Sequence, residues 1–122
     1  MLNFNKLHSS FKFALEGVSV SINENQNIKI HLIIAIFVLI FALLLGLTRY
    51  EFFAVGVLIV LVISAEMINS AIEEVVNLLV NEHRKEAKNA KDVSAGMVLL
   101  VSVFALVVGL FIFIPHILGL FR

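Results

Sequence analysis

The chain has 122 residues, of which 61% are hydrophobic and only 15% are charged, and its formal net charge is zero. Its mean hydropathy of +1.05 excludes an ordinary soluble domain and is typical of a membrane protein. A chain of this length has room for about three membrane spans and no separate soluble domain, so we expect one domain over residues 1–122. Because the chain has no cysteine, disulfides, thiolate catalysis and cysteine-based metal sites are excluded.

Residues 1–30 predict an amphipathic helix at the membrane interface. Charged residues in this segment largely occupy other helical faces than the apolar ones. The apolar residues at helical spacing are Phe4, Leu7, Phe11, Ala14, Leu15, Val18 and Ile22. The rest of the chain offers little soluble protein to pack against, so we expect this helix to lie on the membrane surface.

Three apolar stretches follow, each suited to a membrane-spanning helix. We expect these helices over about residues 32–47, 52–80 and 93–114. A polar hairpin at 46–51 and a charged loop at 81–92 would connect them, and Pro115 would end or bend the third helix. The predicted fold is therefore an all-α membrane protein.

The distribution of Lys and Arg predicts the orientation of the chain in the membrane. Cytoplasmic segments carry an excess of these residues. Two basic residues, Arg49 and Arg122, fall on one side. The others fall on the opposite side: Lys6, Lys12, Lys29, Arg84, Lys85, Lys88 and Lys91. We therefore expect a cytoplasmic N-terminus and a cytoplasmic 81–92 loop.

A polar stripe interrupts the second apolar stretch. Glu66, Asn69, Ser70, Glu73 and Asn77 share one helical face at i, i+3, i+4, i+7 and i+11. Ionisable residues within membrane helices are costly and mark functional sites. At ~1.5 Å per residue from the start of the stretch, Glu66 lies ~21 Å and Glu73 ~31 Å into a ~30 Å hydrocarbon core. The stripe is therefore predicted at the cytoplasmic boundary of the bilayer.

A site at this depth can meet both a lipid headgroup and a water-soluble molecule. Clustered carboxylates favour proton abstraction or a divalent cation, and the nearby Lys91 favours phosphate. A base, a metal ligand and a phosphate-binding cation are the parts of a phosphoryl-transfer site. Neither G-x-x-x-x-G-K-[ST] nor G-x-G-x-x-G occurs, so the common nucleotide-binding loops are excluded.

The motifs that carry the polar residues also resemble a known family. They are E-M-I-N-S-A-I-E-E-V-V-N at 66–77 and A-K-N-A-K-D-V-S-A-G at 87–96. Together with F-x-x-A-x-x-G from Phe11 and N-x-x-I-H from Asn27, they resemble the bacterial membrane-integral diacylglycerol kinase and undecaprenol kinase family. The ending G-L-F-I-F-I-P-H is similar to the undecaprenol kinase branch.

This resemblance implies a fold and an activity. The fold would be a homotrimeric helical bundle with three spans per chain and active sites shared between neighbouring subunits. The chain would sit in the bacterial cytoplasmic membrane and transfer phosphate from Mg²⁺-ATP to a lipid alcohol. Undecaprenol is the preferred acceptor and diacylglycerol the second. No nucleic acid is expected among the partners.

The resemblance also implies roles for individual residues by matched position. Glu66 would be the catalytic base on the lipid alcohol, and Ser70 and Ala95 would help to bind that substrate. Glu73 would bind Mg²⁺ beside the nucleotide. The other expected ATP-binding residues are Lys6, Asn69, Glu82, Lys91 and Asp92.

Two positions depart from the family pattern. The family places a second metal-binding Glu where this chain has Asn25, and Glu24 stands one residue earlier. An Asn can offer a carbonyl oxygen but no charge, so both Glu24 and Asn25 are candidates for completing the metal site. The Asp that closes the family motif is Asn77 here, which removes one negative charge from the stripe.

Other interpretations of the same residues stay open. A small proton-coupled transporter also uses an intramembrane Glu, and a non-catalytic membrane adaptor would use the stripe only to hold helices together. Lys91 and Asp92 can simply begin the third helix, where an Asp in the first turn is favoured by the helix dipole. The basic run at 84–88 is also typical of a positive-inside signal.

Overall fold

A computed structural model of the chain describes residues 3–122 and consists of four helices. They are α1 (Phe4–Glu24), α2 (Gln26–Leu44), α3 (Arg49–Leu79) and α4 (Lys85–Gly119). By length and composition, α2, α3 and α4 can each cross a membrane, which confirms the predicted all-helical, multi-pass architecture. Of the predicted segment 1–30, the first two residues lie outside the described part.

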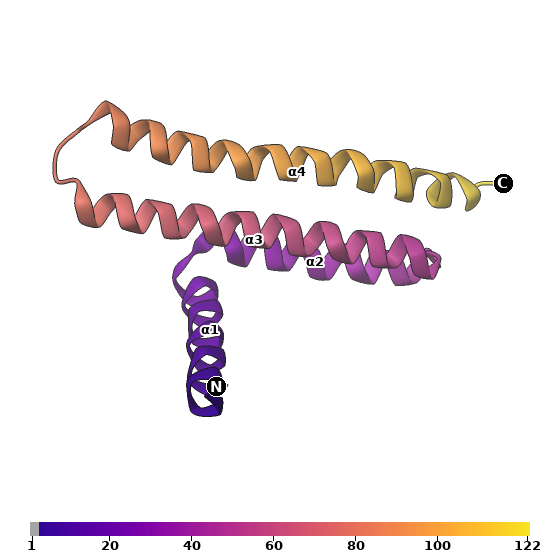
Figure 1. The fold of residues 1–122 in the computed structure, drawn as a ribbon. Helices are drawn as coiled ribbons and strands as arrows, with labels where there is room; N and C mark the ends of the chain where they lie inside the picture. The colour runs from indigo at the N-terminus through magenta and orange to yellow at the C-terminus, as the bar shows by residue number, and fades with distance from the viewer. Residues whose placement is uncertain (1–2) are drawn as a thin grey trace.

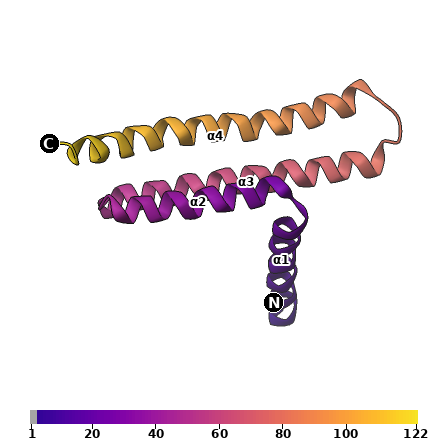
Figure 2. The ribbon, with the colours of Figure 1, turned by 180° about the vertical axis from the view of Figure 1, so that it is seen from behind.

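The long helix α3 is the centre of the arrangement. It packs along α2 on one side and along the antiparallel α4 on the other, whereas α1 projects away from all three (Figure 1). The view from behind shows the same separation of α1 from the bundle (Figure 2). No residue of α1 is buried within residues 3–122. The chain therefore holds α1 chiefly through its junction with α2.

Small residues predominate on the buried face of α2. The buried residues of α2 are Ile28, Ala35 and Ala42, which recur every seven residues and so share one face. Small residues at such positions are typical of helix contacts in membranes. In contrast, no residue in the most apolar stretch of α4, which is described throughout, is buried. Much of the apolar surface of this helix is left to lipid or to another chain.

The first helix boundary differs from the prediction. The break between the surface segment and the first span falls at Asn25, not near residue 31. Asn25 has an extended backbone, and its Oδ1 accepts hydrogen bonds from the backbone N–H groups of Asn27 (2.8 Å) and Ile28 (3.3 Å). The helix begins where an Asn can cap it, although the hydropathy rises only some residues later.

The last connection is also shorter than predicted. The expected charged loop at 81–92 is wrong over residues 85–92, because α4 already begins at Lys85. Lys, Glu and Ala are good helix formers, so a charged sequence can extend a helix beyond the membrane. Pro115 does not end the helix, which continues to Gly119. Since proline lacks an N–H, the cost at this point is one backbone hydrogen bond.

The turn between α2 and α3 is built from local hydrogen bonds. Gly46 has φ of 68°, and its N–H and that of Leu47 donate to the carbonyls of Leu43 and Ala42, respectively, at the end of α2. Thr48 then begins α3 in a capping box with Glu51, with Thr48 Oγ1 accepting from the Glu51 N–H at 3.3 Å.

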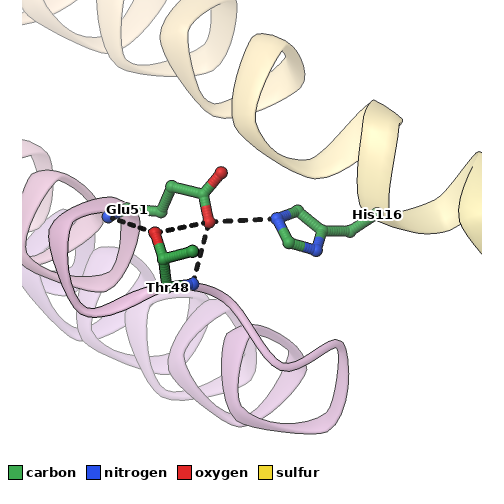
Figure 3. Close-up of polar contacts among 3 residues, drawn as sticks. All are labelled: Thr48, Glu51 and His116. Carbon is green, nitrogen blue, oxygen red and sulfur yellow. Dashed lines mark hydrogen bonds and ion pairs between the residues drawn. The ribbon is translucent and has the colours of Figure 1, made fainter.

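A histidine from the far end of the chain joins this turn. Nε2 of His116, on α4, lies 3.0 Å from Glu51 Oε2, which also accepts from the Thr48 hydroxyl and N–H at 2.8 Å each (Figure 3). The contact links the beginning of α3 to the end of α4. It therefore fixes the α3–α4 pair at the end opposite the short 80–84 connection.

Candidate functional site

The polar stripe of α3 lines a pocket beside the α1–α2 junction. This pocket has a volume of about 490 Å³. Glu66, Ser70 and Glu73 line it from α3, and Glu24 and Asn25 line it from the junction. Figure 1 shows this junction next to α3. The structure thus brings together five residues for which the sequence analysis predicted roles as catalytic base, as lipid-binding residue or as metal ligands.

Glu66 lies deepest in this group. Its side chain is only 2% exposed, and its Oε1 has no hydrogen-bond partner among residues 3–122. The Ser70 hydroxyl donates to the Glu66 backbone carbonyl at 2.9 Å, and Asn25 Nδ2 in turn donates to Ser70 Oγ. A buried carboxylate oxygen without a donor is costly, so this atom is available to a group that brings a proton.

Asn69 faces α4 and not the pocket. It is 6% exposed, and its Oδ1 lies 2.7 Å from the hydroxyl of the buried Ser94. The same hydroxyl lies 2.9 Å from the backbone carbonyl of Lys91. The sequence analysis missed Ser94, although it belongs to the 87–96 motif and follows Lys91 by three residues, which is one helical turn.

A second, more basic pocket lies next to the first at the 80–84 connection. Its volume is about 750 Å³, and Glu82 and Lys91 line it together with Arg84, Lys85 and Lys88. Asn77 lines both pockets and accepts a hydrogen bond from Lys91 Nζ at 2.6 Å. Two residues assigned to the nucleotide therefore share a basic pocket that adjoins the acidic one.

Besides Asn69, three predicted site residues lie outside these pockets. Asp92 is exposed and pairs with Lys88 one turn earlier on α4. Ala95 is exposed beside the buried Ser94. Lys6 is in the first turn of α1, at the end of that helix farthest from the bundle (Figure 1). Within a single chain, none of the three joins the residues around Glu66.

The acidic pocket offers oxygen ligands that suit Mg²⁺. Glu24, Glu66, Glu73 and Glu74 all contribute to its lining. Among residues 3–122, no three His, Asp or Glu side chains converge closely enough to enclose a metal ion. Mg²⁺ is usually bound through one or two carboxylates plus substrate phosphates and water, so a pocket with dispersed carboxylates fits this ion.

An apolar cavity of about 400 Å³ lies between α2, α3 and α4. Val62 and Ile63 of α3 line it, and Glu66 follows one turn later in the polar pocket. Ser102 of α4 also lines this cavity. Its hydroxyl oxygen is buried and has no hydrogen-bond partner among the described residues. The sequence analysis had no signal for this cavity, because its walls come from three separate helices.

Three apolar helices with a carboxylate-rich pocket on the central one define a multi-pass membrane protein with a polar site. Residues 12–113 match the sequence model of the family described as prokaryotic diacylglycerol kinase. The chain therefore belongs to the prokaryotic diacylglycerol kinase family, as its motifs predicted.

Two relatives show how far the similarity extends. An undecaprenol kinase from Bacillus subtilis is 35% identical over 111 residues, covering 91% of this chain and 90% of that protein. A diacylglycerol kinase from Synechocystis sp. is 40% identical over 112 residues, covering 91% of this chain but only 64% of that longer protein. The family and both relatives are named as kinases, and the transporter alternative finds no support.

Proposed function

We propose that this chain is a lipid kinase that transfers phosphate from ATP to undecaprenol at the membrane surface. The observation that carries the proposal is the position of Glu66 on α3, between an apolar cavity and a polar pocket. A lipid alcohol needs room for hydrocarbon next to a base for its hydroxyl. The two cavities provide both on successive turns of one helix.

The chemistry follows from this arrangement. The hydroxyl of the lipid donates its proton to the free carboxylate oxygen of Glu66, and the lipid oxygen attacks the γ-phosphorus of ATP. A bond forms between that oxygen and phosphorus, the bond from phosphorus to the β–γ bridging oxygen breaks, and ADP leaves. Lys91 and the other basic residues of the second pocket hold the phosphates by charge.

We assign the metal to carboxylates of the acidic pocket. Glu73 would hold Mg²⁺, with a second ligand from the α1–α2 junction. When bound, the ion neutralises charge on the β- and γ-phosphates. Glu82 would lie at the adenosine end of the basic pocket.

The oligomer and the orientation belong to the same proposal. Asp92, Ala95 and Lys6 lie away from Glu66 in one chain, and the apolar face of α4 is uncovered. A homotrimer would cover this face and bring such residues to a neighbouring site.

With the Lys- and Arg-rich segments in the cytoplasm, ATP would reach the basic pocket from that side and α1 would lie along the bacterial inner membrane surface.

Undecaprenol is preferred over diacylglycerol for two reasons. The chain and the undecaprenol kinase cover about nine tenths of each other, whereas the diacylglycerol kinase is considerably longer. The segment from Gly109 to His116 also resembles the undecaprenol kinase branch.

A direct assay tests the activity and the acceptor together. The purified chain is incubated in lipid micelles with γ-labelled ATP and either undecaprenol or diacylglycerol, and the products are separated by thin-layer chromatography. We expect label in undecaprenyl phosphate. Label in phosphatidic acid alone would overturn the choice of acceptor, and no labelled lipid with any alcohol would overturn the kinase assignment.

The role of Glu66 is tested in the same assay. Glu66→Gln keeps the shape of the side chain but removes the base, so we expect the rate to fall by about 10²- to 10⁴-fold. Glu16→Gln is the matched control, because Glu16 is exposed on α1 and outside both pockets. Equal rates for the two variants would contradict a catalytic role for Glu66.

A further inference from the structure

Asn25 is one of the two candidates for the second metal ligand, and its side-chain oxygen is already engaged. Its Oδ1 accepts from two backbone N–H groups, those of Asn27 at 2.8 Å and Ile28 at 3.3 Å. An amide oxygen has two lone pairs, and both are used by this cap of α2. The amide nitrogen donates to Ser70 Oγ on α3. Nothing on this side chain is left for a cation.

The hydrogen bonds of Asn25 continue to the backbone of Glu66. The Ser70 hydroxyl donates a hydrogen bond to the backbone carbonyl of Glu66 at 2.9 Å. A single series of contacts thus joins the first turn of α2, the middle of α3 and the turn that carries Glu66. On the α2 side of the junction Ile28 is fully buried, whereas α1 contributes no buried residue within the described part of the chain.

We propose that Asn25 is a positioning residue that ties the α1–α2 junction to α3 through Ser70, and that Glu24 supplies the metal ligand from this junction. This inference rests on the proposed kinase function and deepens it. Glu24 lines the same pocket as Glu66 and Glu73, and it precedes Asn25 directly. The tether therefore also sets where the Glu24 carboxylate lies relative to α3.

Asn25→Asp separates the two roles of this residue. An Asp caps a helix as well as an Asn does, so the first turn of α2 is kept, but it has no N–H to donate to Ser70. It can accept from the Ser70 hydroxyl only when that hydroxyl gives up the Glu66 carbonyl, so the series of contacts is broken in either case. If Asn25 were a metal ligand, the added charge would tighten metal binding. Under the positioning role, kcat falls and metal binding is not tightened. Because the α1–α2 junction would then be held less well against α3, we expect Asn25→Asp to lower kcat by about 10- to 100-fold.

Variants of Ser70 and Glu24 complete the experiment. Ser70→Ala should lower kcat as Asn25→Asp does, the double variant should be no worse than either single variant, and Ser70→Thr should restore the rate because it keeps the hydroxyl. Glu24→Gln should instead weaken Mn²⁺ binding about tenfold, measured by electron paramagnetic resonance with a non-hydrolysable ATP analogue. Tighter Mn²⁺ binding in Asn25→Asp together with unchanged binding in Glu24→Gln would overturn the proposal.

A measurement without turnover keeps this inference distinct from the kinase assignment. The chain has no cysteine, so nitroxide labels can be placed at Ser9→Cys on α1 and Leu78→Cys on α3, both at exposed positions. Labelled chain is diluted with unlabelled chain so that only distances within one chain contribute. We expect the distance distribution to broaden in Asn25→Asp and Ser70→Ala and to recover in Ser70→Thr.

The two possible failures then differ. If the distances respond as expected but no lipid is phosphorylated, the tether stands and the kinase function fails. If the enzyme is active and neither the distances nor kcat respond to Asn25→Asp and Ser70→Ala, the positioning role is wrong.

Discussion

Glu66 combines near-complete burial with a carboxylate oxygen that lacks a donor within residues 3–122. An unpaired buried acceptor raises the free energy of the empty site, so a ligand that supplies an O–H group is favoured there. The hydroxyl of a lipid alcohol is such a group. The burial of this side chain therefore supports binding of the acceptor as well as removal of its proton.

The neighbouring acidic residues Glu73 and Glu74 should differ in their effect on the metal. Glu73 shares the helical face of Glu66, whereas Glu74 lies ~100° further around α3. We expect Glu73→Ala to raise the Mg²⁺ concentration needed for half-maximal activity about tenfold, and Glu74→Ala to raise it much less. Titration of activity with Mg²⁺ at fixed ATP measures this, and equal shifts would contradict the assignment.

Individual residues differ in how well the sequence predicts them. The spacing of Glu66, Ser70 and Glu73 was enough to place them on one face, and all three line one pocket. The partner of Ser70, Asn25, and the partner of Asn69, Ser94, could not be identified as such. Hydrogen bonds between helices depend on helix rotation and register. Glu73 remains exposed while Glu66 is buried, since α1 turns away from α3 beyond the contact with Ser70.

At the scale of the helices, the start of α3 is stabilised far from the polar pocket. The Thr48 hydroxyl accepts from the Glu51 N–H and completes the capping box. We expect Thr48→Ala to lower the free energy of unfolding by about 1 kcal/mol, because an N–H at the helix start loses its partner. Thermal unfolding in detergent measures this.

Thr48→Ser is the matched control for this cap because it keeps the hydroxyl. It should unfold close to the original temperature, and both variants should keep the original rate per folded molecule, since Thr48 lies outside the pockets around Glu66 and Lys91. If Thr48→Ala proved as stable as Thr48→Ser, the cap would contribute nothing.

Existence of the helices was easier to predict than their ends. Long apolar stretches and helical spacing were sufficient for α2, α3 and α4. Hydropathy marks where a helix enters the membrane, whereas caps and helix propensity decide where it begins. This explains why α4 starts at Lys85 within a charged segment and why α2 starts at Gln26 after a capping Asn.

At the scale of the whole molecule, the proposed trimer has a numerical consequence. If each active site takes Glu66 from one chain and Asp92 from its neighbour, inactive Glu66→Gln and Asp92→Ala chains can complement each other. Random equal mixing should restore about one quarter of the original activity, because half of the chains supply each intact partner.

Mixing each variant with itself is the control for complementation. These samples should stay inactive after the same treatment. If the mixed sample also stays inactive while trimers form, Glu66 and Asp92 do not meet across neighbouring chains, and the proposed sharing of the site is wrong.

The acidic pocket is lined by residues at the corner where α1 departs from the bundle. Figure 2 shows this corner on the flank of the bundle. Its position determines how a lipid reaches the site and how the product leaves. Under the proposed function, a long polyprenyl tail would enter sideways from the surrounding leaflet and would not have to be threaded through a closed tunnel. Once its head acquires phosphate, the product can drift away along the same plane. Each catalytic cycle then proceeds without the spans having to part.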